Sequence, residues 1–316
     1  MKVVLAGPYP TGTFTRMQAL LKDANIELIE AISQEAFDAV NDVDAIILRV
    51  LKMPKETIER FSPNLKLIMR WGAGYDSVDV ETAKQKGIAV CNTPGANAYA
   101  VSEMTVLLML AVGRKLICHD RSLREGIWSK NTFLNQSFTL NNKVVGVVGG
   151  GNIGRQVAKK VQAFGATVQY YDAFRLKPEM EKEFHMTYSE LNQLLATSDI
   201  VTLHVPLLDS TKHMIDEEHI NMMKTGAIII NAARGGVIDE KAVLKAVQDG
   251  KLAGAGIDCV EFEPLAKDDP LLGNSNIIIT PHVAGGVADI ADAIIPMIVE
   301  NLKYLNEGKT LKYKVN

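Results

Sequence analysis

The sequence has little that would point to an extracellular, membrane or nucleic-acid-binding protein. It contains three cysteines, Cys91, Cys118 and Cys259, and neither their number nor their spacing fits a disulfide framework or a CxxC motif. A formal charge of −3 at pH 7 gives no basic surface of the kind that holds phosphate backbones or anionic lipids. The longest apolar run, residues 104–113, is about half as long as the ~20 residues of a membrane span. We therefore expect a cytoplasmic protein whose partners include neither nucleic acid nor membrane.

What the sequence does contain is an alternation of apolar strands and helical segments. Its 316 residues are enough for two domains, each with a core of its own. The alternation begins at residues 2–7 and restarts at residues 143–149, whose sequence echoes the first. Because continuous apolar strands separated by helices are typical of parallel sheets covered on both faces, we predict an α/β fold with two doubly wound parallel-sheet domains. The predicted strands cover residues 2–6, 26–29, 45–48, 67–69, 88–90, 143–149, 166–171, 200–204, 227–231, 254–258 and 277–280.

Two predicted helices bear on how the domains are divided. Residues 98–116 have the length and apolar spacing of one long helix, which we expect to connect the two α/β halves. A polar stretch, residues 121–142, follows it. The last predicted helix, residues 288–306, fits either as a cap on the second domain or as a return to the first, and its residues alone leave both options open.

A glycine loop opens the second half. Gly149, Gly151 and Gly154 have the G-x-G-x-x-G spacing, directly after an apolar strand and before a predicted helix over residues 152–164. The first glycine allows a tight turn, the second lets the backbone approach a pyrophosphate, and the third lets helix and strand pack closely. Unpaired N–H groups at the start of the helix then face the phosphate charge. The loop therefore predicts a dinucleotide-binding domain.

An acidic residue stands where such a site needs one. Asp172 ends the next strand, twenty-one positions beyond Gly151. A carboxylate there accepts hydrogen bonds from the adenosine ribose hydroxyls and repels a 2′-phosphate. Arg175 is a nearby cation that could instead accommodate such a phosphate. On balance the sequence predicts NAD as the cofactor in preference to NADP.

Three residues with complementary chemistry follow predicted strands of the second half: Arg234, Glu263 and His282. Since the carboxyl ends of parallel strands line the ligand crevice of an open sheet, we expect all three at one site. An arginine grips a carboxylate through a planar pair of donors. A histidine exchanges a hydroxyl proton near neutral pH, and a carboxylate beside the ring orients it and stabilises its charged form. The pattern predicts hydride transfer between a nicotinamide and a 2-hydroxy acid, without a metal.

Further motifs stand in a fixed order along nearly the whole chain. They lie at residues 72–79, at residues 92–95 followed by Glu103, at residues 149–154, at residues 203–207 with Thr211, at residues 231–235, at residues 256–258 with 261–264, and at residues 281–285. In this set and order the chain resembles the D-isomer-specific 2-hydroxyacid dehydrogenase family, which includes phosphoglycerate, glycerate and D-lactate dehydrogenases.

The resemblance implies a division of the chain that its residues alone leave open. A flavodoxin-like substrate domain would consist of residues 1–98 plus 287–316, and a Rossmann NAD-binding domain, residues 99–286, would be inserted into it. The last helix would then return to the first domain, and the active site would lie between the domains. Members of the family are usually homodimers through the cofactor domains, with residues 121–142 as a plausible arm.

The resemblance also implies roles for individual residues. Arg234 would bind the substrate carboxylate and carbonyl, His282 would be the acid/base with Glu263 behind it, and the backbone of Ala73 and Gly74 would hold the carboxylate. Asp258 would orient the nicotinamide carboxamide. The residues implied in cofactor binding are Thr105, Gly149, Gly151, Asn152, Ile153, Gly154, Asp172, His204, Val205, Pro206, Thr211, Ala232, Ala233, Arg234, Asp258 and His282.

Some positions depart from the family's pattern or qualify it. Cys259 and Val260 stand where the family often has valine and phenylalanine, and Val287 stands where a threonine often follows the histidine. Arg49 and Lys52 resemble cations that meet a substrate phosphate in phosphoglycerate-specific members, which makes Arg49 a candidate substrate residue. The alternative for these two cations is an ordinary solvated loop.

The leading interpretation is an NAD-dependent oxidoreductase that reduces a small 2-oxo acid to the D-2-hydroxy acid. One alternative is a D-3-phosphoglycerate dehydrogenase of serine biosynthesis, and a second is an NAD-sensing binding protein similar to corepressors on this fold. A metal-dependent hydrolase is disfavoured, because His213 and His219 are six positions apart, without the i, i+4 spacing of a zinc-binding helix.

Overall fold

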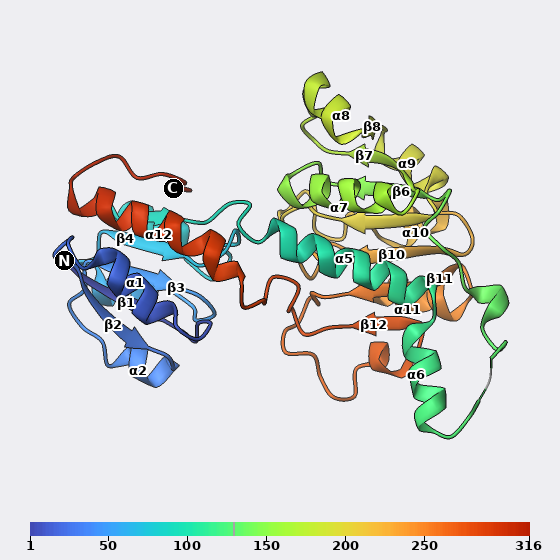
Figure 1. Cartoon of the computed structure of the whole chain (residues 1–316), viewed down its shortest axis with the longest axis horizontal. Helices are drawn as coiled ribbons and strands as arrows, with labels where there is room; N and C mark the ends of the chain where they lie inside the picture. The colour runs from blue at the N-terminus through green and yellow to red at the C-terminus, as the bar shows by residue number, and fades with distance from the viewer. Residues whose placement is uncertain (129) are drawn as a thin grey trace. The chain divides into compact units, whose positions relative to one another are not determined.

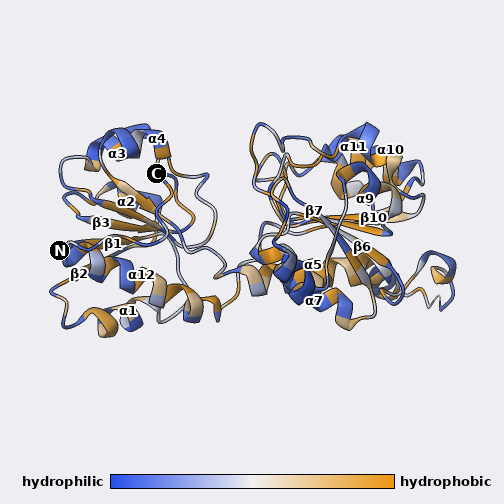
Figure 2. Ribbon diagram, turned by 90° about the horizontal axis from the view of Figure 1, so that it is seen from above, coloured by the Kyte–Doolittle hydropathy of each residue, from blue (hydrophilic) through white to orange (hydrophobic). Residues whose placement is uncertain are grey.

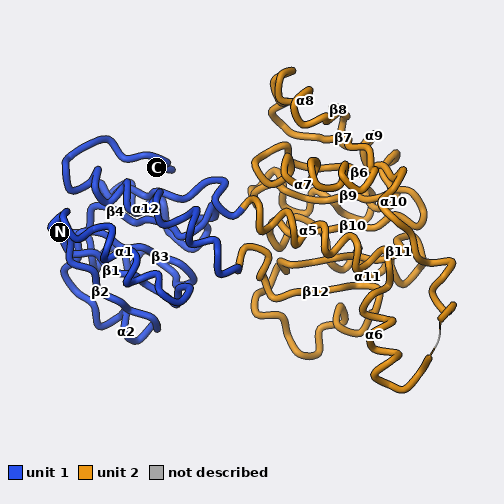
Figure 3. The backbone as a smooth tube through the Cα atoms, viewed as in Figure 1, with its two compact units in different colours: residues 1–97, 287–316 blue, residues 98–286 orange. Residues whose placement is uncertain are grey.

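A computed structural model describes residues 1–128 and 130–316, and it divides the chain into two compact units. The first unit combines residues 1–97 with residues 287–316, and the second consists of residues 98–286 (Figure 3). The expected arm, residues 121–142, includes Ser129, which lies outside the described residues. Among the described residues, no helix has both the length and the hydropathy of a membrane span.

The first unit is built on a five-stranded parallel sheet in the order β2-β1-β3-β4-β5 (Figure 1). This is the flavodoxin-like strand order. Its strands are β1 (Lys2–Ala6), β2 (Glu27–Ala31), β3 (Ala45–Leu48), β4 (Leu67–Arg70) and β5 (Ala89–Cys91). Its helices are α1 (Thr13–Leu21), α2 (Gln34–Asp38), α3 (Lys55–Phe61), α4 (Val80–Gln85) and α12 (Ile290–Asn306).

Helices cover both faces of this sheet, because its middle strand β3 is apolar and buried at every position and the strands beside it are apolar over most of their length. Val3 and Leu5 of β1 are buried in one core with Ile294 and Ile298 of α12, which also packs against α1. The other face of β1 lies in a second core with the helices α2 to α4. Figure 2 shows the apolar strands between the more polar outer faces of the helices. The last helix of the chain therefore completes the core of the first unit.

The second unit carries a seven-stranded parallel sheet in the order β12-β11-β10-β9-β6-β7-β8. Its strands are β6 (Val144–Val148), β7 (Thr167–Tyr171), β8 (Thr187–Tyr188), β9 (Ile200–Leu203), β10 (Ala227–Asn231), β11 (Leu252–Ile257) and β12 (Ile277–Ile279). Its helices are α5 (Ala98–Gly113), α6 (Leu116–Arg124), α7 (Asn152–Ala163), α8 (Pro178–Phe184), α9 (Leu191–Thr197), α10 (Glu217–Met222) and α11 (Glu240–Gln248), with 3-10 turns η1 (Leu134–Gln136) and η2 (Pro270–Gly273). The strand order reverses between β6 and β9, and ligands of such sheets bind at this switch point. The predicted fold class is confirmed.

One predicted helix was wrong in its extent. Instead of one helix over residues 98–116, α5 ends at Gly113 and α6 begins at Leu116, with Lys115 in the left-handed region at φ 52°. The side chain of Lys115 is buried, and its Nζ donates to the carbonyl of Ala253 at 2.7 Å and to Oδ1 of Asn276 at 2.9 Å. These tertiary hydrogen bonds offset the cost of the break, which local apolar spacing does not reveal.

Candidate active site

The glycine loop joins β6 to α7 and has the shape that a pyrophosphate needs. Gly149 lies at φ 106°, and a Cβ on Gly154 would lie only 2.0 Å from the carbonyl oxygen of Gly149, so both positions require glycine. A Cβ on Gly151, in contrast, would meet no described atom within 4 Å. The backbone at Gly151, which is the N-cap of α7, therefore faces open space that a phosphate group can enter.

Asp172 lies beside this loop, as the spacing predicted. Its Oδ2 accepts a hydrogen bond of 2.7 Å from the N–H of Gly150, and its Oδ1 accepts one of 2.9 Å from Phe174. Each oxygen keeps a lone pair for a ribose hydroxyl. Arg175 donates from Nε to Glu181 at 2.8 Å, so its charge is already paired with a carboxylate. The residues around the loop therefore fit NAD, and the structure brings the predicted glycines and the predicted acid together.

The loop after β9 contributes a buried imidazole. His204 Nε2 lies 2.9 Å from the hydroxyl of Thr202, while Nδ1 is buried without a hydrogen-bond partner among the described atoms. Burial lowers the pKa of His204 to about 3, so the ring stays neutral. Thr211 donates to the carbonyl of Pro206 at 2.6 Å and accepts from Leu208 N–H at 2.8 Å, which closes the loop on itself.

Other predicted cofactor residues form a small apolar cluster. Ala232 after β10, Ala284 after β12 and Val101 of α5 are buried together, and Ile153 of α7 packs against them. Thr105, one helical turn beyond Val101, is fully buried, and its hydroxyl donates to the Val101 carbonyl at 2.8 Å. The structure thus gathers segments from four elements beside the switch point of the sheet.

The turn that carries Arg234 is shaped by a buried asparagine that sequence reasoning did not single out as a site residue. Asn231, the last residue of β10, is fully buried; its Nδ2 donates to the Arg234 carbonyl at 2.9 Å, and its Oδ1 accepts from Ala233 N–H at 3.2 Å. A Cβ on Gly235 would lie 1.9 Å from the carbonyl oxygen of Val260. The turn is therefore pressed against the segment after β11. An asparagine ending an otherwise apolar strand was the signal available in the sequence.

His282 and Glu263 form a direct pair. Nδ1 of His282 lies 3.0 Å from each carboxylate oxygen of Glu263. The two side chains are 45% and 42% exposed, respectively, so the pair is accessible to a small molecule. His282 has a φ of 53°, a conformation that L-residues other than asparagine, aspartate and histidine seldom adopt. The backbone is held there by neighbouring hydrogen bonds.

Asp258 supplies those hydrogen bonds. Its buried carboxylate accepts from the Thr280 hydroxyl at 2.6 Å and from the N–H groups of Val283 and Ala284 at 2.9 Å each. Its main-chain carbonyl accepts from the N–H of His282 at 2.7 Å. The structure therefore places Asp258 as the residue that holds the loop bearing His282.

The thiol of Cys259 lies where the three predicted catalytic residues meet. Its Sγ is 3.6 Å from the carbonyl oxygen of Ala233, next to Arg234, and within 4.8 Å of ligating atoms of Glu263 and His282. Burial raises the pKa of Cys259, the Asp258 and Glu263 charges raise it further, and the Arg234 charge lowers it. The charges of Arg234 and Glu263 therefore both act on the Cys259 thiol, which lies at the carboxyl ends of β10, β11 and β12.

In the first unit, Arg70 joins the loops that carry the predicted substrate residues. Its Nε donates to the Gly74 carbonyl at 3.0 Å, and its Nη1 donates to the Arg49 carbonyl at 2.8 Å. Asn92 Nδ2 donates to the Ala73 carbonyl at 2.7 Å. The guanidinium of Arg49 itself donates to the carbonyl of Pro8. Sequence reasoning missed Arg70, although an arginine at the end of an apolar strand was visible.

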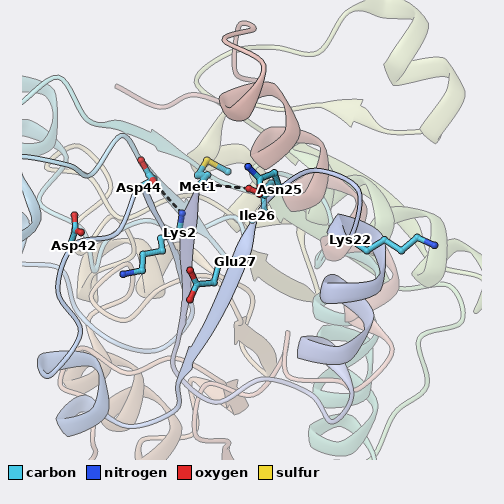
Figure 4. Close-up of a pocket in the computed structure, with 8 residues that line it drawn as sticks. All are labelled: Met1, Lys2, Lys22, Asn25, Ile26, Glu27, Asp42 and Asp44. Atoms are coloured by element: carbon cyan, nitrogen blue, oxygen red, sulfur yellow. Dashed lines mark hydrogen bonds between the residues drawn. The ribbon is translucent and has the colours of Figure 1, made fainter.

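A hollow of about 530 Å³ in the first unit lies away from these loops, at the amino ends of β1 and β2. Figure 4 shows its lining, with Lys2 N–H donating to Asp44 and the Met1 amino group donating to Asn25. In an open parallel sheet, ligands bind at the carboxyl ends of the strands. The hollow is therefore not part of the candidate site.

Comparison with known proteins gives the class and then the family. The model of the D-isomer specific 2-hydroxyacid dehydrogenase NAD binding domain matches residues 106–284, so the protein is an NAD-dependent oxidoreductase. A glyoxylate reductase from Korarchaeum cryptofilum is 36% identical over 281 residues, which cover 88% of this chain and 84% of that protein. The chain belongs to the D-isomer specific 2-hydroxyacid dehydrogenase family.

Two further matches are informative. A D-3-phosphoglycerate dehydrogenase from Methanocaldococcus jannaschii is 38% identical over 284 residues, which cover 90% of this chain but 53% of that protein. The crystal structure of a glyoxylate reductase from Paecilomyes thermophila superimposes with a TM-score of 0.88 and 31% identity, covering 100% of this chain and 98% of that one. The family resemblance and the NAD cofactor expected from the sequence are confirmed.

Proposed function

We propose that this dehydrogenase reduces a small unphosphorylated 2-oxo acid with NADH, with glyoxylate as the first candidate, and gives the D isomer where the product is chiral. The observation that carries the mechanism is the His282–Glu263 pair, with 3.0 Å from Nδ1 to each carboxylate oxygen. Glyoxylate is the first candidate because two of the similar proteins, one by sequence and one by structure, are glyoxylate reductases.

The roles of the residues follow from their chemistry. Since Glu263 holds Nδ1 of His282, the ring presents Nε2 as the atom that gives a proton to the carbonyl oxygen during reduction and takes it back during oxidation. Glu263 stabilises the charged ring between these steps. Arg234 grips the substrate carboxylate through its planar donors. Bound NADH supplies the hydride.

The cofactor would be held by the second unit. Gly149, Gly151 and Gly154 would admit the pyrophosphate at the start of α7, and Asp172 would bind the adenosine ribose. Asp258 would keep the His282 loop in place beside the nicotinamide. We assign residues 99–286 to the NAD-binding domain and residues 1–98 with 287–316 to the substrate domain, where Ala73 and Gly74 would bind the substrate carboxylate.

We further propose that the protein is a cytoplasmic homodimer. Leu116, Ile117 and Leu123 of α6 are about half exposed, and Trp128 beyond this helix is 84% exposed. Several exposed large apolar side chains on one helix and the segment after it support a protein–protein contact surface. A second copy of the chain is the expected partner, and sedimentation velocity tests it: a Trp128→Lys variant should shift toward the monomer, and unchanged sedimentation would reject this surface.

The alternative, a D-3-phosphoglycerate dehydrogenase, is favoured by one relative of that name, of which the chain spans about half. It requires Arg49 to meet a substrate phosphate. Kinetics of an Arg49→Ala variant on phosphohydroxypyruvate and hydroxypyruvate separate the two functions. A selective rise of KM for the phosphorylated acid supports the alternative, and equal changes for both acids reject it.

The test of the main proposal is the loss of NADH absorbance with a panel of 2-oxo acids that includes glyoxylate, pyruvate and hydroxypyruvate. A His282→Ala variant should lower turnover by roughly 10²–10⁴-fold, because the proton transfer loses its catalyst. NAD binding of this variant is measured in parallel by protein fluorescence, so that turnover is compared with the cofactor bound. Binding without turnover in the wild type would instead support the NAD-sensing alternative.

A further inference from the structure

Three different metal-ligating groups converge beside the candidate site. They are the thiol of Cys259, the carboxylate of Glu263 and the imidazole of His282, and one ligating atom from each lies within 4.8 Å of the other two. Cys259 is 1% exposed, whereas the other two side chains face solvent. The proposed reaction uses the carboxylate and the imidazole, and it has no role for the thiol.

The backbone segments that carry two of the three groups, Cys259 and His282, are held together before any ion arrives. Cys259 directly follows Asp258, whose carbonyl and carboxylate bind the N–H groups of His282, Val283 and Ala284. On the other side, Sγ lies 3.6 Å from the Ala233 carbonyl oxygen. The backbones that carry the sulfur and the imidazole are therefore tied to each other by hydrogen bonds. An ion would need to draw in only the exposed side chains of Glu263 and His282.

The donor set selects the kind of ion. One thiolate sulfur, one imidazole nitrogen and one carboxylate oxygen suit a borderline-soft cation such as Zn²⁺ rather than Mg²⁺ or Ca²⁺. Zinc lies about 2.0–2.3 Å from such donors, so in a tetrahedral site the donors are about 3.5 Å apart. The three ligating atoms lie within 4.8 Å of one another, so rotation of the two exposed side chains would bring the donors to this spacing. Water fills the fourth position.

We propose that Cys259, Glu263 and His282 form an inhibitory binding site for a zinc ion. On binding, Sγ–H loses its proton to solvent and a Zn–S bond forms, while a ring nitrogen of His282 and a carboxylate oxygen of Glu263 become ligands. The ion thereby breaks the hydrogen bond between His282 and Glu263, and the bound imidazole can no longer transfer a proton to or from the substrate. This inference rests on the proposed function only for its effect on catalysis; the binding itself needs only the three side chains.

The activity test compares three proteins. Wild type, Cys259→Val and the control Cys118→Ala, which removes the buried thiol of α6, are titrated with ZnCl₂ in the NADH assay and rescued with EDTA. Wild type and control should be inhibited at the same concentration, and Cys259→Val should need at least about ten times more zinc. Basal turnover of Cys259→Val should match the wild type, because the thiol takes no part in the reaction. Equal zinc sensitivity of all three overturns the proposal.

A spectroscopic test does not depend on activity. Co²⁺, which takes the place of Zn²⁺ at such sites, gives a near-ultraviolet charge-transfer band when a thiolate binds it. The band should appear with wild type and Cys118→Ala and be absent with Cys259→Val and Cys259→Ser, the second variant guarding against a packing effect. A band that persists without Cys259 overturns the site. If no 2-oxo acid is reduced, the proposed function fails, while the cobalt band still decides whether the site exists.

Discussion

The first strand of each sheet along the chain is followed by the same kind of turn, but the two loops then differ. In each, an apolar strand ends at a glycine with positive φ, Gly7 at 113° in the first and Gly149 at 106° in the second. In the second unit the helix starts three residues later, and Gly151 faces open space. In the first the helix starts at Thr13, and the longer connection carries Tyr9.

Tyr9 occupies the space at the strand ends of the first unit, whereas the corresponding loop of the second unit leaves open space at Gly151. Its hydroxyl donates to the carbonyl of Ile47 at 2.7 Å, and its ring packs edge-on against Trp71 with 5.0 Å between ring centres. Burial raises the pKa of this phenol, so it stays a donor. The comparison shows that a doubly wound sheet does not by itself make a nucleotide site. Whether such a sheet can bind a nucleotide depends on the length of the loop after this strand and on the residue that the loop carries.

The largest effect is expected from breaking the second loop. In Gly154→Ala the new Cβ would overlap the Gly149 carbonyl, 2.0 Å away in the present backbone, so the loop must move. We expect NAD affinity to fall by more than about 100-fold, with a loss of stability of about 2–4 kcal/mol. Isothermal titration and thermal unfolding measure the two effects. The control is Gly7→Ala in the first unit, which should lower stability while NAD affinity stays within two-fold; equal losses of affinity would contradict the comparison.

A smaller effect is expected from the acid beside the loop. Asp172→Ser removes the carboxylate that repels a 2′-phosphate, so the ratio of kcat/KM for NADH over NADPH should fall by about ten-fold or more. The pairing of Arg175 with Glu181 limits the gain in NADPH activity. Adding Glu181→Gln should release Arg175 and raise NADPH activity further. If cofactor preference does not change in either variant, Asp172 does not read the ribose.

The corresponding prediction for the first unit concerns Tyr9, which lies in the loop after β1. Tyr9→Phe removes the buried hydroxyl that donates to the Ile47 carbonyl, which should cost about 1–2 kcal/mol of unfolding free energy. Urea unfolding measures this loss. NAD affinity should not change, since Tyr9 belongs to the strand ends of the first unit; a change in affinity would show that the two loops are not independent.

The last prediction concerns Glu240 of the second unit, which should make the stability of the protein depend on pH. Burial raises the pKa of Glu240 to about 7, helped by the charges of Glu261 and Asp269, while a hydrogen bond from Glu261 N–H and the nearby His213 oppose the shift. The protonated folded state is thus favoured, and its contribution is present below the ordinary glutamate pKa and lost as pH rises through about 7.

Because solvent screens this half-buried group, we expect it to contribute about 1 kcal/mol to the free energy of unfolding. Wild-type melting temperature should therefore fall between pH 5 and pH 7 by more than that of Glu240→Gln. Parallel curves for the two proteins would mean that Glu240 titrates normally.

The sequence predicts the buried strands well, but it does not predict the break between two helices or a short edge strand. The buried strands were predicted because continuous apolar runs such as Ile228–Ile230 have only one environment that accepts them. The break at Lys115 was not, because it depends on carbonyl and amide groups more than a hundred residues away. The short edge strand β8 carries no apolar run and was missed for the same kind of reason.

At the site, the glycine loop and its acid could be predicted because they are local and sterically demanding. Arg234, Glu263 and His282 were found by their chemistry, and their catalytic roles stay predictions. The residues that position the site were missed as such: Asn231 donates to the carbonyl of Arg234 within its own turn, and Arg70 donates to the carbonyl of Gly74 and to that of Arg49, which follows a neighbouring strand. Hydrogen bonds of this kind are set by tertiary structure, and residue type alone does not reveal the partner.

The return of α12 to the first unit also orders the assembly of the chain during synthesis. Residues 98–286 leave the ribosome as one uninterrupted segment, with all the strands of their sheet. The first unit, although its sheet is made first, has only part of the core over Val3 and Leu5, contributed by α1, until Ile294, Ile298 and Leu302 have been made. The part of the protein that is translated first is therefore the part that is finished last.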